Sequence, residues 1–395
     1  MFHSTIQFFK NRPALSIGFL FSTGSLLLGI FVAAIPTIRD RLSFTTEELG
    51  FSLMIGALGA LTGVALSSSF FSRVLAGRWL FIGHMLLPLI YIIQIYSPTR
   101  LIFWLALFAN GLVGFFNGVS TNSIVDLLEK KSNQRIMSTC HGMYSLGGGV
   151  SAGLAALFFL WQIPVHYQIS IVAAAIILTI IFIFRKDLLA HKVFIHSGAG
   201  VAMPPRSILG LSFICFVSFM GEGCIADWSA IYLGESLGSN KSMLSLGYAG
   251  FSAMMAIGRF NGDNLIAKTG ARKLVVSSCL IAGAGFGLVV LAGIPVIAIA
   301  GFTMVGVGLA CVVPVLFSAA ANVKGISPVV GIASVASGGL LGFLAGPPAI
   351  GIVAHEINMA TGLGFVGLLI IIAAIVASKN KFLGANMSSP FIELT

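Results

Sequence analysis

Residues 136–184 read IMSTCHGMYSLGGGVSAGLAALFFLWQIPVHYQISIVAAAIILTIIFIF, and these 49 residues contain no Asp, Glu, Lys or Arg. A helix crosses the hydrocarbon core of a membrane with about 20 apolar residues, so this run is too long for one crossing. Gln162 and Pro164 supply the polar break that a turn requires. The stretch therefore predicts two membrane-spanning helices, at 136–160 and 165–184.

The rest of the chain has the same character. Hydrophobic residues make up 57% of its 395 residues and charged residues only 9%, against about 25% charged in a typical soluble domain. A single globular core stops growing near roughly 250–300 residues, so a soluble fold could not bury this much apolar surface. The apolar windows predict twelve spans, at 14–36, 49–72, 79–97, 101–125, 136–160, 165–184, 207–233, 244–267, 273–292, 295–321, 328–353 and 358–378.

Lys and Arg are distributed unevenly between the predicted loops. If the N-terminus lies inside, 18 of the 22 basic residues fall on the cytoplasmic side. The remaining four are Arg39, Arg41, Arg100 and Lys241. This bias satisfies the positive-inside rule and predicts that both termini are cytoplasmic. Because the basic loops also explain the net charge of +10, we expect no nucleic-acid partner.

The longest internal polar stretch, RKDLLAHKVFIHSGAGVAMPPR, occupies residues 185–206. It is basic, contains Gly and Pro, and separates the sixth predicted span from the seventh. We therefore expect a cytoplasmic linker between two six-helix bundles, at 1–184 and 207–395, the second ending in a short cytoplasmic tail. An offset of about 193 residues relates the starts of the two bundles, as in transporters built from two parallel-related repeats.

The end of the eighth span carries a motif of glycines, an acid and basic residues, whose members are Gly258, Arg259, Gly262, Asp263 and Arg272. It resembles the signature loop of the major facilitator superfamily. Glycines let helices approach closely, and an Asp at a helix end can face the positive N-terminus of another helix. The resemblance implies a gating role for these residues. The corresponding first-half segment, 67–78, has basic residues and a glycine but no Asp.

Three further segments carry a narrower resemblance: span four with Asn110 and Asn117, the start of span five at 137–148, and span seven from Glu222 to Leu233. Together they look like a bacterial branch of the superfamily that includes rhizopine-permease-like proteins and lies near the fucose and other sugar permeases. The resemblance implies an all-α integral membrane protein with the major facilitator fold and a place in the bacterial inner membrane. It also implies secondary transport by alternating access, coupled to protons, of a small polar or sugar-like solute.

Two carboxyl groups in span seven are candidates for proton coupling. Ionisable residues at membrane depth are expensive and mark functional sites, and Glu222 is the acid that we place deepest, with no basic residue at its depth. Burial between Gly221 and Gly223 disfavours the ionised carboxylate, which suits a group that takes up and releases a proton. Asp227 falls nearer the outer mouth. A structural carboxyl bonded to a neighbouring helix remains the alternative for Glu222.

Polar and aromatic side chains elsewhere are candidates for the substrate cavity: Asn110, Asn117, Thr121, His141, Ser145, Trp228 and Tyr232. The first three recur at spacings of seven and four residues and form one polar stripe on span four. Amides offer both donors and acceptors, which suits a solute with hydroxyl groups. Interhelical hydrogen bonding explains the stripe equally well, and an aromatic belt at the membrane boundary explains Trp228 and Tyr232.

Other functional classes find less support in the sequence. We expect no enzyme activity, cofactor or metal site, because we find no nucleotide-binding loop, metal-ligand cluster or convincing nucleophile–base pair. The expected partners are the lipid bilayer, protons and a small-molecule substrate, and the expected state is a monomer. Two alternatives stay open: an exporter of lipophilic compounds, which the strongly apolar span ten would also serve, and a membrane receptor on the same fold.

Overall fold

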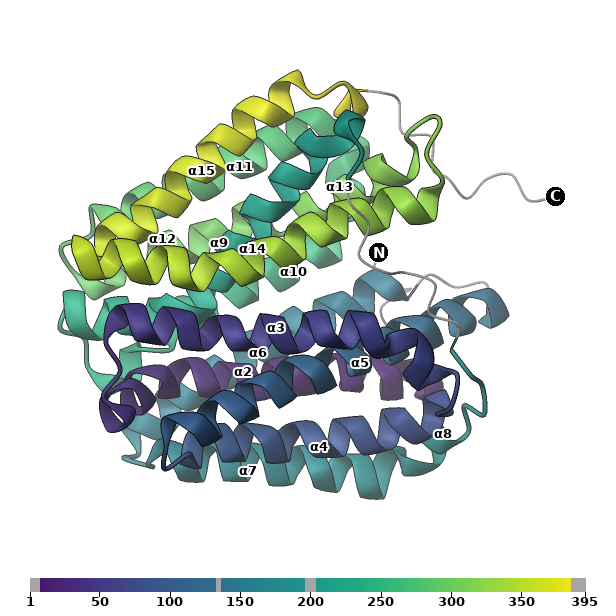
Figure 1. Ribbon diagram of the computed structural model, residues 1–395, viewed down its shortest axis with the longest axis horizontal. Coiled ribbons are helices and arrows are strands. Elements are labelled where there is room, and N and C mark those ends of the chain that lie inside the picture. Colours follow the sequence, from purple (N-terminus) through teal and green to yellow (C-terminus); the bar gives the residue numbers. More distant parts are fainter. Residues whose placement is uncertain (1–7, 133–135, 196–203, 385–395) are drawn as a thin grey trace.

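The computed structural model describes residues 8–132, 136–195 and 204–384, and in this part of the chain the fold is built from helices (Figure 1). The first half contains α2 (Arg12–Leu42), α3 (Thr46–Phe71), α4 (Ala76–Tyr96), α5 (Arg100–Ser132), α6 (Met137–Leu160), α7 (Val165–Thr179) and α8 (Arg185–Leu189). The second contains α9 (Leu209–Ile231), α10 (Leu246–Thr269), α11 (Ala271–Val290), α12 (Pro295–Leu309), α13 (Val312–Ala321), α14 (Pro328–Glu356) and α15 (Met359–Lys379).

Short turns of other helical types join some of these helices. A π-helical turn, Ile180–Phe184, connects α7 to α8, and a second one, Tyr232–Ser236, follows α9. Short 3-10 turns lie at Arg206–Ile208, Lys241–Met243 and Lys381–Leu383. Because α7 runs on into α8, and α12 into α13, each of these pairs counts as one span.

The helices agree with the predicted spans to within a few residues at most boundaries. Eleven helical stretches of the described chain are long and apolar enough to cross a membrane. The twelfth predicted span, 244–267, corresponds to α10, which carries Arg259 and Lys268 within its length. The predicted turn between α6 and α7 is also present, and Gln162 occupies it with a φ of 58°.

Helices pair in the same way within the two halves, which lie one above the other in Figure 1. In the first half α2 packs against α6, and in the second α9 packs against α14. These are the first and fifth helices of each half. Between the halves, α6 packs against α10 and α3 packs against α14. The interface is therefore formed by equivalent elements from the two bundles.

The halves converge at one end of the molecule, the end away from the start of α2 and the end of α15. A Cβ on Gly50 would come within 2.6 Å of the Pro347 carbonyl oxygen, so α3 and α14 touch through their backbones there. The Ser245 hydroxyl, just before α10, donates to the carbonyl oxygen of Ala152 in α6 at 2.8 Å. Towards the other end, which we call the terminal end, the ribbons of the two halves diverge (Figure 1).

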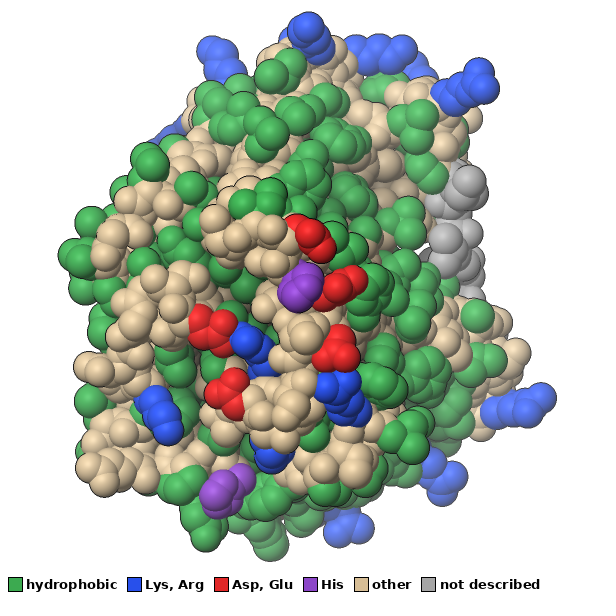
Figure 2. All heavy atoms as spheres, turned by 60° about the vertical axis from the view of Figure 1, so that its left-hand side comes forward, with side chains coloured by type: hydrophobic (Ala, Val, Ile, Leu, Met, Phe, Trp, Pro, Cys, Tyr) green, Lys and Arg blue, Asp and Glu red, His purple; other side chains and the backbone are tan. Residues whose placement is uncertain are grey.

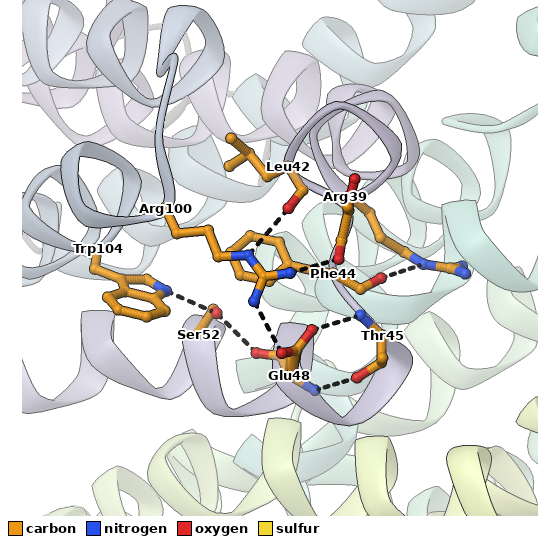
Figure 3. Close-up of polar contacts among 9 residues, drawn as sticks. Arg39, Leu42, Phe44, Thr45, Glu48, Ser52, Arg100 and Trp104 are labelled. Atoms are coloured by element: carbon orange, nitrogen blue, oxygen red, sulfur yellow. Dashed lines mark hydrogen bonds and ion pairs between the residues drawn. The ribbon is translucent and has the colours of Figure 1, made fainter.

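Ion pairs hold the converging end, where acidic and basic side chains lie close together on the surface (Figure 2). Arg39, at the end of α2, pairs with Glu235 after α9 and so joins the two halves. Arg100 pairs with Glu48 at 2.8 Å and also donates to the carbonyl oxygen of Leu42, all within the first half (Figure 3). Glu48 also forms a capping box with Thr45 at the start of α3. The polar contacts at the start of α3 are therefore made within the first half.

The segment 190–195, which we call the strap, belongs to the predicted linker. Leu75, the N-cap residue of α4, makes no side-chain capping bond. Instead the amides of Ala76 and Gly77 donate to the carbonyl oxygens of Val193 and His191, at 2.8 and 2.9 Å. The first amides of a helix have no partner within the helix, so the strap caps α4 with its backbone. A Cβ on Gly77 would collide with this backbone, which explains the glycine.

Candidate functional site

Arg259 occupies the centre of the interface between the halves. From α10 its guanidinium lies 3.4 and 3.5 Å from the two carboxylate oxygens of Glu222 on α9. It also donates to the hydroxyl of Ser145 on α6, at 2.8 Å. The side chains of Arg259 and Glu222 are 15% and 17% exposed. One side chain therefore contacts the acid of its own half and a hydroxyl of the other half.

This pairing corrects the expectation that Glu222 has no basic residue at its depth and that Arg259 belongs to a helix end. The helix α10 continues to Thr269, and ten further residues at 1.5 Å each place Arg259 about 15 Å inside it. Removing Arg259 from the cytoplasmic count of Lys and Arg leaves 17 against 4. The uneven distribution still predicts cytoplasmic termini. The carboxyl of Glu222, however, has a cationic partner.

Two tyrosines lie beside the ion pair, and a third lies beside those two. Tyr144 of α6 interacts electrostatically with both Arg259 and Glu222, and Tyr248 of α10 interacts with Glu222 and with the other two tyrosines. Tyr91 of α4 lies within hydrogen-bonding reach of Asn110. We did not predict these tyrosines as site residues. The available signal was a phenol hydroxyl in the middle of a span, because a buried Tyr hydroxyl usually needs a partner.

The exposure of α6 shows which of its faces is open. His141 and Tyr144 are exposed, the latter to 37%. They share a helical face with Gly148, where an added Cβ would lie 3.0 Å from the Tyr248 hydroxyl. Since Tyr248 belongs to the second half, this face looks into the interface and not towards lipid. His141 and Tyr144 are therefore accessible beside a stretch of α6 that α10 covers, where a Cβ on Gly142 would collide with Phe260.

The polar stripe predicted on the fourth span divides into two parts. Asn110 lies beside Tyr91. Asn117 is 4% exposed and donates to the carbonyl oxygen of Gly83 in α4 at 3.1 Å. Thr121 donates back to the Asn117 carbonyl oxygen at 2.8 Å. The structure thus brings Asn110 to the tyrosines and places Asn117 and Thr121 in a contact within the first half.

Of the other predicted cavity residues, Ser145 contacts Arg259, and His141 packs edge-on against Phe21 with ring centroids 5.1 Å apart. Trp228 is completely buried, and Tyr232 is 2% exposed and donates to the carbonyl oxygen of Val289 at 2.7 Å. Such burial excludes the aromatic-belt explanation for this pair. They pack inside the second half.

The second coupling candidate, Asp227, has a different environment from Glu222. It shares a face of α9 with Met220 and Gly223, and both of these meet α14, at Gly346 and Phe343. Within the described part of the chain its carboxyl makes no ion pair or hydrogen bond. The structure therefore separates the two predicted acids, which lie on different faces of α9.

The two glycines of the predicted gating motif lie where α10 packs against another helix. A Cβ on Gly258 would collide with Ala310, and one on Gly262 would lie 3.6 Å from the Cys311 sulfur, so both glycines let α10 approach the junction of α12 and α13. Arg272 donates to the carbonyl oxygen of Asn380 at 2.9 Å. The side chain of Asp263 lies outside the described part of the chain.

Comparisons with known proteins identify relatives over most of the chain. The model of the Major Facilitator Superfamily matches residues 211–381. The chain is 30% identical to an uncharacterised MFS-type transporter of Yersinia pestis, over 90% of this chain and 92% of the relative. It is also 30% identical to the membrane protein MosC of Rhizobium meliloti, over 96% and 92% of the two chains.

Solved structures share its architecture at lower sequence identity. The nucleoside transporter NupG superposes with a TM-score of 0.68 and 13% identity, over 93% of this chain and 98% of NupG. A bacterial homologue of the human lysosomal transporter Spinster, in an inward-facing and unoccupied conformation, gives 0.67 and 15%, over 94% and 96% of the two chains. At these identities the likeness concerns the fold alone.

Proposed function

The chain belongs to the Major Facilitator Superfamily and is a secondary transporter, and we propose that it couples the passage of a small polar, sugar-like solute to protons. The observation that carries this proposal is the contact of Arg259 with Glu222 and Ser145, at the interface between the two halves. Charges inside a membrane protein are costly unless they are paired. The pair of Arg259 with Glu222 lies at the interface between the halves, so its contacts can change when the halves move in a transport cycle.

The geometry of the pair suits exchange of a proton. Its N–O distances of 3.4 and 3.5 Å are longer than the 2.7–2.9 Å of a strong charge-assisted hydrogen bond. Protonation of Glu222 would neutralise the anionic partner of Arg259 and leave Ser145, on the other half, as its remaining partner. Proton uptake would therefore release Arg259 from the acid of its own half and so alter the residue that contacts the other half.

The orientation is part of the same proposal. The excess of Lys and Arg in the loops at the terminal end supports a cytoplasmic location for both termini. In that orientation the open end faces the cytoplasm and the converging end, with Arg39 and Glu235, faces outwards. The relatives are bacterial proteins, which supports the inner membrane of a bacterium as the location.

The variant Glu222→Gln tests proton coupling. Glutamine resembles the protonated carboxyl permanently, so this variant should lose accumulation of solute driven by a pH gradient but keep exchange of solute across the membrane. The assay is uptake into proteoliposomes, with the solute found by thermal-stabilisation screening. Asp227→Asn is measured beside it, since Asp227 is the second coupling candidate and lies on the same helix but outside the pair. Accumulation by Glu222→Gln at the normal level would show that Glu222 is structural.

A further inference from the structure

The outer face of α4 ends in an arginine at the terminal end of the molecule. The helix packs against α5, α7, α2 and α8 of its own half, and with α7 it lies on the side of the first half farthest from the second (Figure 1). Its exposed apolar side chains recur every three or four residues and so form one stripe that faces lipid: Ile82, Leu86, Leu89 and Ile93. Arg78, which is also exposed, continues this stripe by one turn towards the start of the helix.

The length of α4 places Arg78 near a boundary of the hydrocarbon core. The helix has 21 residues, which extend about 31 Å at 1.5 Å each, and the hydrocarbon core of a bilayer is about 30 Å thick. Its first and last residues, Ala76 and Tyr96, therefore lie at the two boundaries when α4 crosses the membrane. A long basic side chain at this depth can extend to the phosphate groups of the lipids while its methylene groups stay on apolar surface.

A second arginine lies on the same small surface. Arg185, the first residue of α8, is exposed, and its guanidinium carbon lies 5.9 Å from the ring centroid of Phe81. Phe81 follows Arg78 by three residues, so the two are neighbours on the surface of α4. The contact with Phe81 therefore holds Arg185 beside the end of the lipid-facing stripe, next to Arg78.

The positive charge of this surface is not balanced by its own helix. The sequence of α4 contains no Asp or Glu, and Asp187 of α8 already pairs with Arg12 at 3.0 Å. Lys131 at the end of α5 acts electrostatically on His191 of the strap and so adds a further positive charge nearby. A cation in the first turn of a helix is disfavoured by the helix dipole, so Arg78 does not serve the stability of α4. An anionic partner would explain it.

The strap adds apolar side chains at the same depth. Its backbone accepts hydrogen bonds from the amides of Ala76 and Gly77, and Phe194 forms an isolated antiparallel bridge with Leu75. Val193 and Phe194 are 37% and 51% exposed. Because the strap lies at the end of a lipid-facing helix, lipid at the membrane boundary can cover these two side chains.

We propose that Arg78, Arg185 and the strap form a binding site for an anionic phospholipid of the cytoplasmic leaflet. The two guanidinium groups bind the phosphate, which they recognise through paired N–H donors. Val193 and Phe194 contact the upper part of the acyl chains, so the lipid covers the strap where it caps α4. Basic side chains next to a membrane span attract anionic lipids in general. The site lies away from the interface between the halves and depends on neither the solute nor proton coupling.

Titration of the purified protein in a neutral detergent with phosphatidylglycerol tests the site. The melting temperature should rise with phosphatidylglycerol but not with phosphatidylcholine of the same chain length, nor with inorganic phosphate, which lacks acyl chains. A basic residue near an anionic lipid surface contributes about fivefold in affinity. The double variant Arg78→Gln with Arg185→Gln should therefore bind phosphatidylglycerol roughly 25-fold more weakly.

The double variant Lys273→Gln with Lys324→Gln is the matched control. It removes two exposed basic residues from the second half and should keep the original affinity for phosphatidylglycerol. Equal losses in the two double variants would overturn the proposal, since the lipid would then respond to net charge alone. Equal stabilisation by phosphatidylcholine, or unchanged affinity after the loss of both arginines, would overturn it as well.

The surroundings of Phe194 provide a test that does not depend on thermal stability. A spin label is attached after Phe194→Cys, with the buried native cysteines replaced, and the protein is placed in vesicles that contain phosphatidylglycerol. Oxygen, which concentrates in lipid, should relax this label more than a water-soluble nickel chelate does. A label after Ser132→Cys, at the exposed end of α5, should show the reverse. Greater access of the chelate than of oxygen at position 194 would contradict the proposed contact with lipid.

Discussion

Arg259 can serve two partners on different helices because a guanidinium carries five N–H donors in a rigid plane. One terminal nitrogen donates to Ser145 and the other faces Glu222. A lysine ammonium is a compact point charge on a flexible stem, which makes it a poorer bridge between two helices. Arg259 therefore connects the halves through the shape of its guanidinium as well as through its charge.

His191 of the strap makes the capping of α4 dependent on pH. Burial lowers the pKa of His191 below its ordinary value; Asp187 opposes this effect and Lys131 adds to it. Because the folded strap disfavours the charged imidazole, its stability is complete above about pH 6.5, the pKa of an unperturbed histidine. It is lost progressively as the pH falls below that value. We expect faster hydrogen exchange of the Gly77 amide at pH 5.5 than at pH 7.5, after correction for the intrinsic rate.

The variant His191→Gln provides the control, since glutamine keeps the strap polar and does not titrate. Its Gly77 amide should show the same corrected protection at both pH values. Equal protection at both pH values in the original protein would contradict the prediction.

At this scale the sequence predicts single residues better than their partners. Glu222 was recognisable, because an acid in the middle of an apolar span is expensive. Its pairing with Arg259 was not, because the pairing depends on how far α10 extends beyond the arginine. For the same reason Asn117 could not be separated from Asn110: both lie on one stripe of α5, and neighbouring helices decide that Asn117 meets α4.

At the scale of whole helices, close contacts between backbones depend on glycine. In α5 a Cβ on Gly111 would fall on the carbonyl oxygen of Gly56 in α3, whereas a Cβ on Gly118 would meet nothing within 4 Å. Small residues allow such close approach where lipid provides no hydrophobic driving force between helices. The packing of α5 against α3 thus requires glycine at position 111, whereas the space beside Gly118 would admit a larger residue.

Gly111→Ala should therefore destabilise the first half, because two backbones must move apart, and overpacking of this kind costs about 1–3 kcal/mol. Gly118→Ala should be neutral or stabilising by up to about 1 kcal/mol, the gain in helix propensity. Melting temperatures of the two purified variants, compared with the original protein, check both signs. A lower melting temperature for Gly118→Ala than for Gly111→Ala would refute this explanation of the contact.

Helix boundaries were the part of the fold most accessible from sequence. Charge-free runs and Gly–Pro breaks place the ends of most spans, as at Pro295, where α12 begins. The exceptions are continuations beyond the apolar run. The helix α5 extends to Ser132 and includes Lys130 and Lys131, because a helix can continue past the membrane wherever its polar residues reach water.

Considered as a whole, the described part of the molecule brings α3 of the first half against α14 of the second at the converging end. Backbone contacts such as that of Gly50 with Pro347 require both halves to be in this arrangement. The ion pair of Arg39 with Glu235 also joins the halves, whereas that of Arg100 with Glu48 lies within one half. In a cycle that opens this end, the first pair must break and the second can remain.

The difference between these two ion pairs leads to a prediction about the conformational equilibrium. The side chains of Arg39 and Glu235 are 20% and 45% exposed, so solvent screens the pair and its contribution is about 0.2–1 kcal/mol. Glu235→Gln should therefore increase the ratio of molecules open at this end by at most about fivefold. Glu48→Gln removes an acid of similar exposure from the first half alone and should leave the ratio unchanged.

Pulsed electron paramagnetic resonance can measure this ratio, with spin labels on cysteines introduced at Pro98 and Glu356, exposed positions in different halves. The five native cysteines are buried and would first be replaced. Glu235→Gln should transfer population to the longer distances, and the exchanged pair Arg39→Glu with Glu235→Arg should restore the original distribution. If both single variants change the distribution equally, the effect comes from lost surface charge. The cross-half pair then does not hold this end closed, and backbone contacts such as that of Gly50 with Pro347 account for the closure.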